Sequence, residues 1–316
     1  MPDEKLGWGA LKLPNPHKAY RYRPNNEFLL DSIEKALTEQ ALWMCPLSTQ
    51  DDLVEASVAL KPTDFSEKHK RMGEAFDRLA TFWIDSNSKL MAEQNGHHFS
   101  EAEFGKLMQE EITHSFQTVL GEKILNADEE ELPNLVEECR AKLRCACFVS
   151  SPTSGVMWGL YANNHEGCCL EYDDHYNRHF YIFNLLAPKL IEYSQEKRIL
   201  DRFDIWEVLA FLTYSNRIEG GPFSISSQND PRVMAAKLLF LTKSNEFSWQ
   251  EEFRVVDLGE TQGYASWEHL KLRKVIFGAR SSNEFIQEVR ERFSTELTYS
   301  QITTEPGNPE LQIVDI

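Results

Sequence analysis

The sequence predicts an α+β fold with a mixed sheet as its core and helices packed beside it. Short segments with the period-two alternation of strands are interspersed with helical patterns, and they lack the regular strand–helix–strand order of a doubly wound sheet. Residues 63–142 carry helical patterns without a strand signal. We therefore expect one domain over residues 1–316, with a helical insertion at 60–142. Residues 20–58 and 143–282 should share one sheet core.

The first strand is expected at residues 20–23, where tyrosine and arginine alternate. Alternation places Arg21 and Arg23 on one face and the two tyrosines on the other. Two arginines on one face of a strand can bind phosphate, or they can protect an exposed sheet edge from aggregation. Residues 25–40 carry the apolar stripe of a helix, and residues 41–46 are apolar enough for a buried strand.

The helical insertion contains its own start and stop signals. Ser100 and Glu103 have the spacing of a capping box. Residues 128–144 begin with acidic and end with basic side chains, as suits the helix dipole. The pair His97 and His98 falls in a polar loop, and we interpret it as solvated.

The middle of the chain is dense in short elements. Residues 144–150 and 168–172 read as strands, and residues 154–163 can form two to three helical turns between them. His165 lies in the turn that follows this helix, where a structural role is favoured over that of a base. Further downstream we expect helices at 203–215, 230–242 and 283–293, and strands at 189–194, 273–279 and 311–316.

The segment 237–256 organises the rest of the chain. A helical lead-in ends near Lys243, and Phe247 to Val256 read as a strand with one mostly apolar face. The other face carries Gln250, Glu252 and Arg254 in a row. A polar row of this kind predicts a strand with one side open to a cleft. The alternative is a solvent-exposed face on which a glutamate–arginine pair contributes little to stability.

Composition narrows the class of ligand and the compartment. The net charge of −17 repels phosphate backbones on average, so an anionic ligand would need a local basic pocket. No apolar run reaches the roughly 18 residues of a membrane-spanning helix, and the N-terminal segment lacks a signal-peptide pattern. We expect a cytoplasmic protein without membrane partners. The six cysteines match no common zinc spacing, so we expect no metal site.

Five segments, in order, resemble the bacterial DUF2971 family. They are YRYR at 20–23, ALWMCPLSTQDD at 41–52, CFVSSPTSGVMWGLYANNHEGCCLEYD at 147–173, LTKSNEFSWQEEFRVV at 241–256 and VIFGARSS at 275–282. The third resembles the family's S-F-S … M-W-x-x-Y-A-x-x-H-x-G run, and the fourth its K-S … W-x-Y-E-x-E-W-R run. The chain departs from the family at Gln50 to Asp52, where Asn-Asp-Pro is usual, at Gln250 in place of glutamate, and at Phe253 in place of tryptophan.

The order of these motifs is also similar to that of the ADP-ribosyltransferase fold. That fold places a basic residue on its first strand, an aromatic or serine motif in the middle, and an E-x-E or Q-x-E pair on a late strand. Here Gln250-Glu251-Glu252 is a Q-x-E. The resemblance implies a mixed split sheet with a helical insertion, NAD as cofactor, and a protein or nucleic acid as acceptor. It also implies a toxin or phage-defence effector.

The resemblance assigns roles to six residues. Glu252 would stabilise the oxocarbenium-like ribose as nicotinamide leaves, and Gln250 would orient the acceptor. Arg23, with Arg21 as second choice, would hold the pyrophosphate. The aromatic side chains Tyr161 and Trp158 would stack on nicotinamide or adenine, with core packing as the alternative for both.

Two other classes of function remain open. A non-catalytic module could bind a nucleotide or a protein through the same cleft. A metal-dependent nuclease could use Asp51, Asp52 and Glu55, although no carboxylate–lysine motif follows to complete its site. Metal-independent NAD consumption would favour the transferase, binding without turnover the module, and metal-dependent cleavage of nucleic acid the nuclease.

Overall fold

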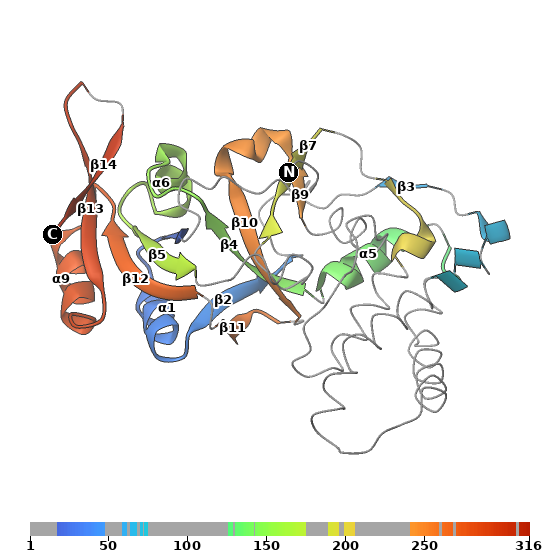
Figure 1. Cartoon of the computed structure of the whole chain (residues 1–316), viewed down its shortest axis with the longest axis horizontal. Coiled ribbons are helices and arrows are strands. Elements are labelled where there is room, and N and C mark those ends of the chain that lie inside the picture. Colours follow the sequence, from blue (N-terminus) through green and yellow to red (C-terminus); the bar gives the residue numbers. More distant parts are fainter. Residues whose placement is uncertain are drawn as a thin grey trace, which may run out of the picture.

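The computed structural model shows a mixed α+β fold with a mostly antiparallel sheet (Figure 1). It describes residues 18–47, 59–61, 64–67, 70–71, 73–74, 126–128, 130–141, 143–174, 189–195, 199–205, 241–258, 261–267, 270–307 and 310–316. None of the helices in these ranges is long and apolar enough to cross a membrane.

Ten strands form the main sheet, in the order β11-β2-β4-β1-β5-β12-β13-β14, with β10 against β4 and β6 against β10. Their bounds are β1 Lys18–Arg23, β2 Ala41–Pro46, β4 Leu143–Val149, β5 Cys168–Asp174, β6 Lys189–Leu190, β10 Glu252–Leu258, β11 Gly263–Ser266, β12 Leu270–Phe277, β13 Thr298–Thr304 and β14 Leu311–Asp315. Within this sheet β12 and β13 run parallel, and the other pairs are antiparallel.

Two small parallel pairs and the helices complete the described structure. The pairs are β3 (Ala59–Leu60) with β8 (Ile199–Leu200), and β7 (Glu192–Ser194) with β9 (Thr242–Ser244). The α-helices are α1 Glu27–Thr38, α5 Leu132–Ala141, α6 Gly155–Tyr161 and α9 Asn283–Arg292, and the 3₁₀ helices are η2 Phe65–Glu67 and η3 Asn245–Gln250.

The main sheet is split along one edge of β4. Strand β10 pairs with the whole length of β4, from Glu252 opposite Val149 to Leu258 opposite Leu143. The opposite edge of β4 is shared by two strands: β1 meets it where Tyr20 faces Val149, and β2 meets it where Cys45 faces Cys145. The two strands therefore diverge from the two ends of β4. We call the opening between them the fork.

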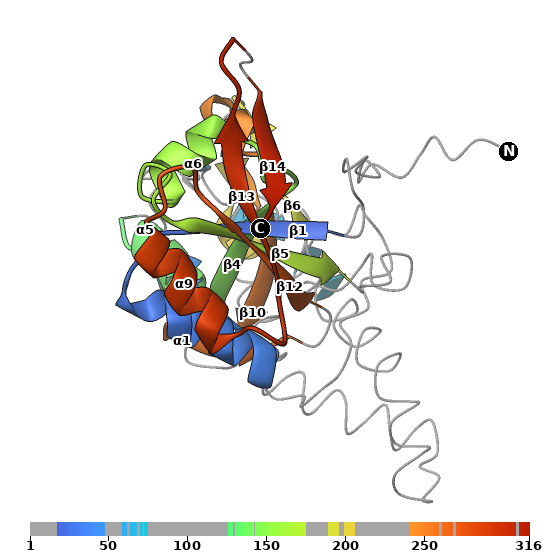
Figure 2. The same ribbon diagram turned by 90° about the vertical axis from the view of Figure 1, so that its left-hand side faces the viewer.

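Helices cover the two faces of the sheet. Helices α1 and α9 lie together on one face (Figure 2), where an ion pair joins Arg292 to Glu34. Val275 and Phe277 of β12 pack into the core beneath them, whereas Ile276 belongs to a second core beneath α6. Because successive side chains of a strand point to opposite faces, α6 lies across the sheet from α1 and α9.

Most of the strands and helices predicted from the sequence are present. Strands lie at the predicted positions near residues 20–23, 41–46, 144–150 and 168–172, and helices lie within 25–40, 154–163 and 283–293. Strands β3, β8, β11 and β13 have no predicted counterpart. The helix expected over 128–144 ends at Ala141, because the chain enters β4 at Leu143.

The predicted strand from Phe247 to Val256 is wrong in its first half. Residues Asn245–Gln250 form the 3₁₀ helix η3, whose N-terminal cap is the side chain of Ser244. Glu251 then adopts a left-handed conformation, with φ 46° and ψ 45°, and β10 begins only at Glu252. The chain has to turn here because β9 pairs with β7 while β10 pairs with β4. Five residues are too few for period-two alternation to exclude the three-residue period of a 3₁₀ turn.

Several predicted features lie outside the described residues. They include the capping box at Ser100, the pair His97 and His98, the candidate nuclease residues Asp51, Asp52 and Glu55, and most of the helices expected at 203–215 and 230–242. Thr242, at the end of the last of these, is in strand β9. The single-domain assignment and the helical insertion at 60–142 stay predictions; within the described residues, η2, α5 and helical residues between 70 and 74 lie in this segment, whereas Leu60 is in strand β3.

A left-handed turn after α6 is packed against two glycines. Asn163, Asn164 and His165 all have positive φ, between 47° and 70°. A Cβ on Gly278 would lie 2.0 Å from the carbonyl oxygen of His165, and a Cβ on Gly167 would lie 2.2 Å from that of Arg23. Any larger residue at either position would push backbone against backbone. The turn thereby fixes the end of β1 that carries Arg23.

Substitution of two glycines should change stability in opposite directions. Gly278→Ala should lower the free energy of unfolding by about 1–3 kcal/mol, the usual cost of overpacking. Gly159→Ala should raise it by about 0.5–1 kcal/mol, because Gly159 is inside helix α6 and a Cβ there meets no atom within 4 Å. Urea titration of both variants measures the difference. Equal stability of the two would contradict the packing described for Gly278.

Candidate functional site

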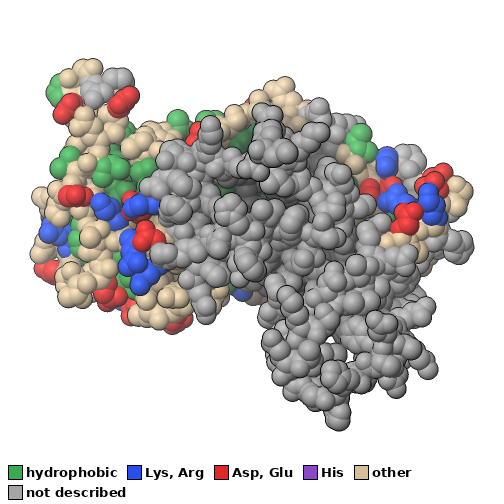
Figure 3. Space-filling view, in the orientation of Figure 1, with side chains coloured by type: hydrophobic (Ala, Val, Ile, Leu, Met, Phe, Trp, Pro, Cys, Tyr) green, Lys and Arg blue, Asp and Glu red, His purple; other side chains and the backbone are tan. Residues whose placement is uncertain are grey.

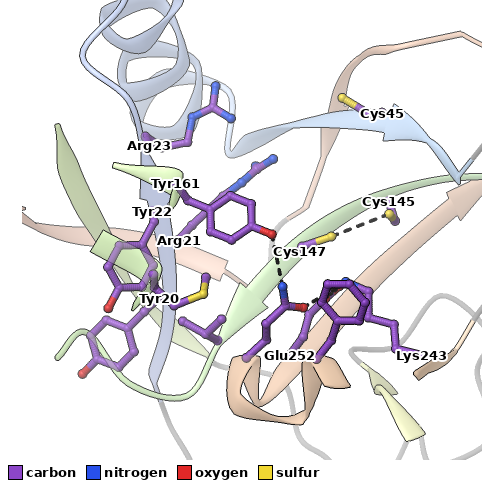
Figure 4. A pocket seen from close by; sticks show the side chains of 14 residues that line it. Tyr20, Arg21, Tyr22, Arg23, Cys45, Cys145, Cys147, Tyr161, Lys243 and Glu252 are labelled. Carbon is purple, nitrogen blue, oxygen red and sulfur yellow. Dashed lines mark hydrogen bonds and ion pairs between the residues drawn. The ribbon is translucent and has the colours of Figure 1, made fainter. Parts of the chain in front are cut away.

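A pocket of about 230 Å³ occupies the fork (Figure 4). All the major elements around the split contribute to its walls. Its lining consists of Tyr20, Arg21, Tyr22 and Arg23 from β1, Cys45 from β2, Cys145, Cys147 and Val149 from β4, Met157 and Tyr161 from α6, Lys243 from β9, Phe247 and Gln250 from η3, and Glu252 from β10. We call it the fork pocket.

The fork pocket carries more positive than negative charge. Its lining includes the cations Arg21, Arg23 and Lys243 and a single carboxylate, that of Glu252. The whole chain has a net charge of −17. On the described part of the face in Figure 3, acidic and basic side chains are intermixed. The fork pocket is therefore the local basic site that an anionic ligand of this acidic chain would need.

Arg21 and Arg23 project from the same face of β1, as strand alternation requires. The Nη2 of Arg21 donates a hydrogen bond of 2.8 Å to the carbonyl oxygen of Trp43, which ties β1 to β2 across the fork. Its guanidinium also lies 5.8 Å from the ring centre of Phe148. These contacts orient Arg21 and leave some of its five N–H donors for a ligand.

Arg23 differs from its neighbour in having no compensating partner. It is half-buried, and no hydrogen bond or ion pair joins its guanidinium to the other residues that the structure describes. Burial, and then repulsion by Arg21, lower the pKa of Arg23 to about 10, so the side chain is still cationic at neutral pH. A desolvated cation without a counter-ion is costly. An anionic ligand would remove that cost.

Glu252 is the centre of a buried ion network. Its side chain accepts a hydrogen bond of 2.6 Å from Lys243 at Oε2 and one of 2.5 Å from Arg254 at Oε1. Glu252 is 4% exposed and Arg254 is fully buried. Burial raises the pKa of Glu252, but the two cations outweigh it and hold the pKa at about 2. The alternative of a solvent-exposed pair between Glu252 and Arg254 is therefore wrong.

The network extends to the opposite wall of the pocket. Lys243 also donates to Oε1 of Gln250 at 3.0 Å, and Nε2 of Gln250 donates to the hydroxyl of Tyr161 at 3.1 Å (Figure 4). Gln250 is buried, and Tyr161 is half-buried. A continuous chain of polar contacts thus joins α6 to β9 and β10, so the walls of the pocket are fixed relative to one another.

The structure places five of the six candidate residues around this one pocket: Arg21, Arg23, Tyr161, Gln250 and Glu252. Trp158 does not reach it. The indole is fully buried, lies 5.1 Å from the ring of Tyr22 and donates from Nε1 to the carbonyl oxygen of Pro152 at 2.8 Å. Trp158 therefore packs in the core, which was the alternative for it, and it cannot stack on a ligand in the fork. The ring of His165 stacks on this indole, at 5.9 Å.

Sequence reasoning missed Lys243 as a site residue. It was expected at the end of a helix, whereas it lies in β9 and bridges Gln250 and Glu252 from a buried position. The signal was present in the sequence, because Lys243 begins the K-S … W run of the fourth motif. That run contains Lys243, the 3₁₀ helix η3 and Glu252, which together form one network.

Three thiols form another wall of the fork pocket, and they too were not predicted. Cys45 faces Cys145 across β2 and β4, and Sγ of Cys145 lies 3.9 Å from Sγ of Cys147. The contact with Cys145, together with burial, raises the pKa of the Cys147 thiol well above its usual range. Cys147 is therefore protonated at neutral pH. Within the described residues no group of three or more His, Cys, Asp or Glu side chains is arranged to hold a metal ion.

Comparison with known proteins gives no match, whether to family models, to curated proteins or to solved structures. The resemblance to DUF2971 and to the ADP-ribosyltransferase fold stays a prediction from the motifs.

The ion network makes a prediction about acid stability. The pKa of Glu252 is depressed from 4.5 to about 2 in the folded protein. Its contribution to stability is therefore fully present above about pH 4.5 and is lost as the pH falls toward 2. Glu252→Gln should lower the free energy of unfolding at pH 7 by about 3–5 kcal/mol, because it leaves two buried cations without their carboxylate.

The difference between wild type and Glu252→Gln should shrink as the pH falls through this window, as measured by urea titration at several pH values. Glu39→Gln is the control, because it removes an exposed carboxylate that pairs with Lys35 on α1 and should change stability by less than about 1 kcal/mol. A difference for Glu252→Gln that is independent of pH would contradict the assignment.

Proposed function

We propose that the fork pocket binds NAD and that the protein is an ADP-ribosyltransferase-like enzyme, which modifies a protein or nucleic-acid acceptor. One observation carries the proposal: Arg23 is half-buried without a counter-ion among the described residues, beside Arg21, in a pocket that also holds Tyr161 and Glu252. A dinucleotide has a pyrophosphate that would pair with Arg23, an aromatic base that would stack on Tyr161, and ribose hydroxyls that would donate to Glu252. The order of the motifs agrees with the same ligand.

The two arginines would share the pyrophosphate. Guanidinium groups bind phosphate oxygens through paired N–H donors, and such charge-assisted bonds are about twice as strong as neutral ones. Arg21 is already oriented by its bond to Trp43. Arg23 gains more from the ligand, since it has no other partner in the described part of the chain. Binding is therefore expected to depend more strongly on Arg23.

Glu252 would act on the ribose. Its depressed pKa keeps the carboxylate ionised throughout the physiological range. Each carboxylate oxygen has two lone pairs, so each can accept a ligand hydroxyl in addition to its bond from Lys243 or Arg254. The same carboxylate would face positive charge that develops on the ribose when nicotinamide leaves. Gln250, fixed between Lys243 and Tyr161, would orient the acceptor.

A second candidate function is a non-catalytic nucleotide-binding module. One observation favours it: both oxygens of Glu252 are already paired with cations. A carboxylate compensated in this way stabilises a further positive charge less well than an uncompensated one. Both candidates bind a nucleotide in the fork, and they differ only in turnover.

Arg23→Gln tests the binding shared by both candidates. It should leave the thermal melting temperature unchanged or higher, because it removes an uncompensated cation close to Arg21. It should weaken NAD binding about 10- to 100-fold, as for the loss of a hydrogen bond to a charged group. Isothermal titration calorimetry measures the affinity. Arg273→Gln is the control, since Arg273 pairs with Asp173 at the surface of β12 and lies outside the fork pocket.

Wild-type affinity in Arg23→Gln would remove the basis of both candidates, as would failure of the wild-type protein to bind NAD or ADP-ribose. Binding without any release of nicotinamide would favour the module over the enzyme.

Glu252→Asp tests the transferase itself. The shorter side chain keeps the charge that compensates Lys243 and Arg254 but withdraws the carboxylate from the pocket. Nicotinamide release should fall by a factor on the order of 100, as for the loss of one preorganised electrostatic contact, while the affinity for NAD changes much less. Circular dichroism confirms that the variant is folded. Wild-type turnover in this variant would show that Glu252 has a structural role only.

A further inference from the structure

A second cavity adjoins the fork pocket. Its volume is about 270 Å³, and it lies between η3 and the segment 150–154 that leads into α6. Val149, Met157 and Gln250 line both cavities, so together they form the ridge between them. We call it the second pocket.

Glu251, at the mouth of the second pocket, has an unusual backbone. With φ 46° and ψ 45° it is left-handed, a conformation that glycine or asparagine adopts with less strain. Its exposed carboxylate accepts a hydrogen bond of 2.6 Å from the hydroxyl of Ser150 at Oε2. Glu251 caps the end of η3, where glycine is the usual left-handed residue, so a glutamate whose side chain is also held in place by Ser150 points to a use for that side chain.

The charge of the second pocket is opposite to that of the fork pocket. Glu251 is the charged residue of its lining, and no ion pair joins it to the other residues that the structure describes. Hydroxyl groups of Ser151, Thr153 and Ser154 add hydrogen-bonding capacity. Trp249, 38% exposed, supplies a flat aromatic wall.

We infer that the second pocket binds a guanidinium group. A planar cation can stack on the indole of Trp249 and at the same time donate paired hydrogen bonds to the carboxylate of Glu251. The bond from Ser150 occupies one lone pair and leaves others for the ligand. An ammonium group could satisfy the charge but not the stacking. The site therefore fits the side chain of arginine better than that of lysine.

The inference stands apart from the proposed function, because binding of a guanidinium requires neither NAD nor turnover. NAD in the fork pocket and a guanidinium in the second pocket would meet at the ridge, where Gln250 contacts both cavities. The binding of the guanidinium itself requires no turnover.

The test uses two small probes of nearly equal shape, butylguanidinium and the neutral butylurea, titrated into the whole protein by calorimetry. Wild-type protein should bind butylguanidinium at least about tenfold more tightly than butylurea, a difference of about 1.4 kcal/mol. In Glu251→Gln this preference should disappear. Glu246→Gln removes an exposed carboxylate from the same 3₁₀ helix, outside both pockets, and should retain the full preference.

A second variant separates binding from folding. Glu251→Gly relieves the left-handed strain, so its melting temperature should be equal to or above that of the wild type, and yet it should bind both probes equally. Trp249→Leu should weaken butylguanidinium binding while keeping Glu251. Absence of a preference in the wild-type protein, or its persistence in both Glu251 variants, would overturn the inference. Either result leaves NAD binding in the fork pocket untouched, because that is measured separately.

Discussion

The ion network around Glu252 is the interaction on which the candidate site depends. Glu252 is the first residue of β10, where the chain leaves the left-handed Glu251, and its two cations come from β9 and from β10 itself. A buried carboxylate is tolerated only where it is paired and hydrogen-bonded. Those pairs fix the end of η3 against the sheet, and through Gln250 they reach α6. The geometry of the fork pocket follows from this compensation.

The split along β4 explains why a pocket exists at this position. A sheet whose strands pair along their whole length has no interior opening, because neighbouring strands lie about 4.8 Å apart. Here β1 and β2 each take only one end of the same edge. The opening between them is bridged by Arg21, whose guanidinium reaches the backbone of β2 at Trp43. An arginine in this position both links the two strands and lines the fork with positive charge.

Local pattern predicted much of the site. Alternation placed Arg21 and Arg23 on one face of a strand, the resemblance to a Q-x-E motif selected Gln250 and Glu252, and all four line the pocket. These successes rest on features that extend over a few residues. The turn at η3 was missed because a few residues do not separate the period of a strand from that of a 3₁₀ helix, and tertiary pairing decides between them. Trp158 was misplaced since an aromatic residue next to a site motif serves the core equally well.

The glycine contacts around Arg23 have a consequence for how the protein is made. Gly167 packs against the carbonyl of Arg23, and Gly278, after β12, packs against that of His165. The position of Arg23, at the end of β1, is thus set by residues that are synthesised much later. Contacts so distant in sequence form slowly, since loop closure precedes them. The pocket cannot be assembled on the nascent chain before β12 and Gly278 have been synthesised, so any activity in the fork is withheld until these later residues are in place.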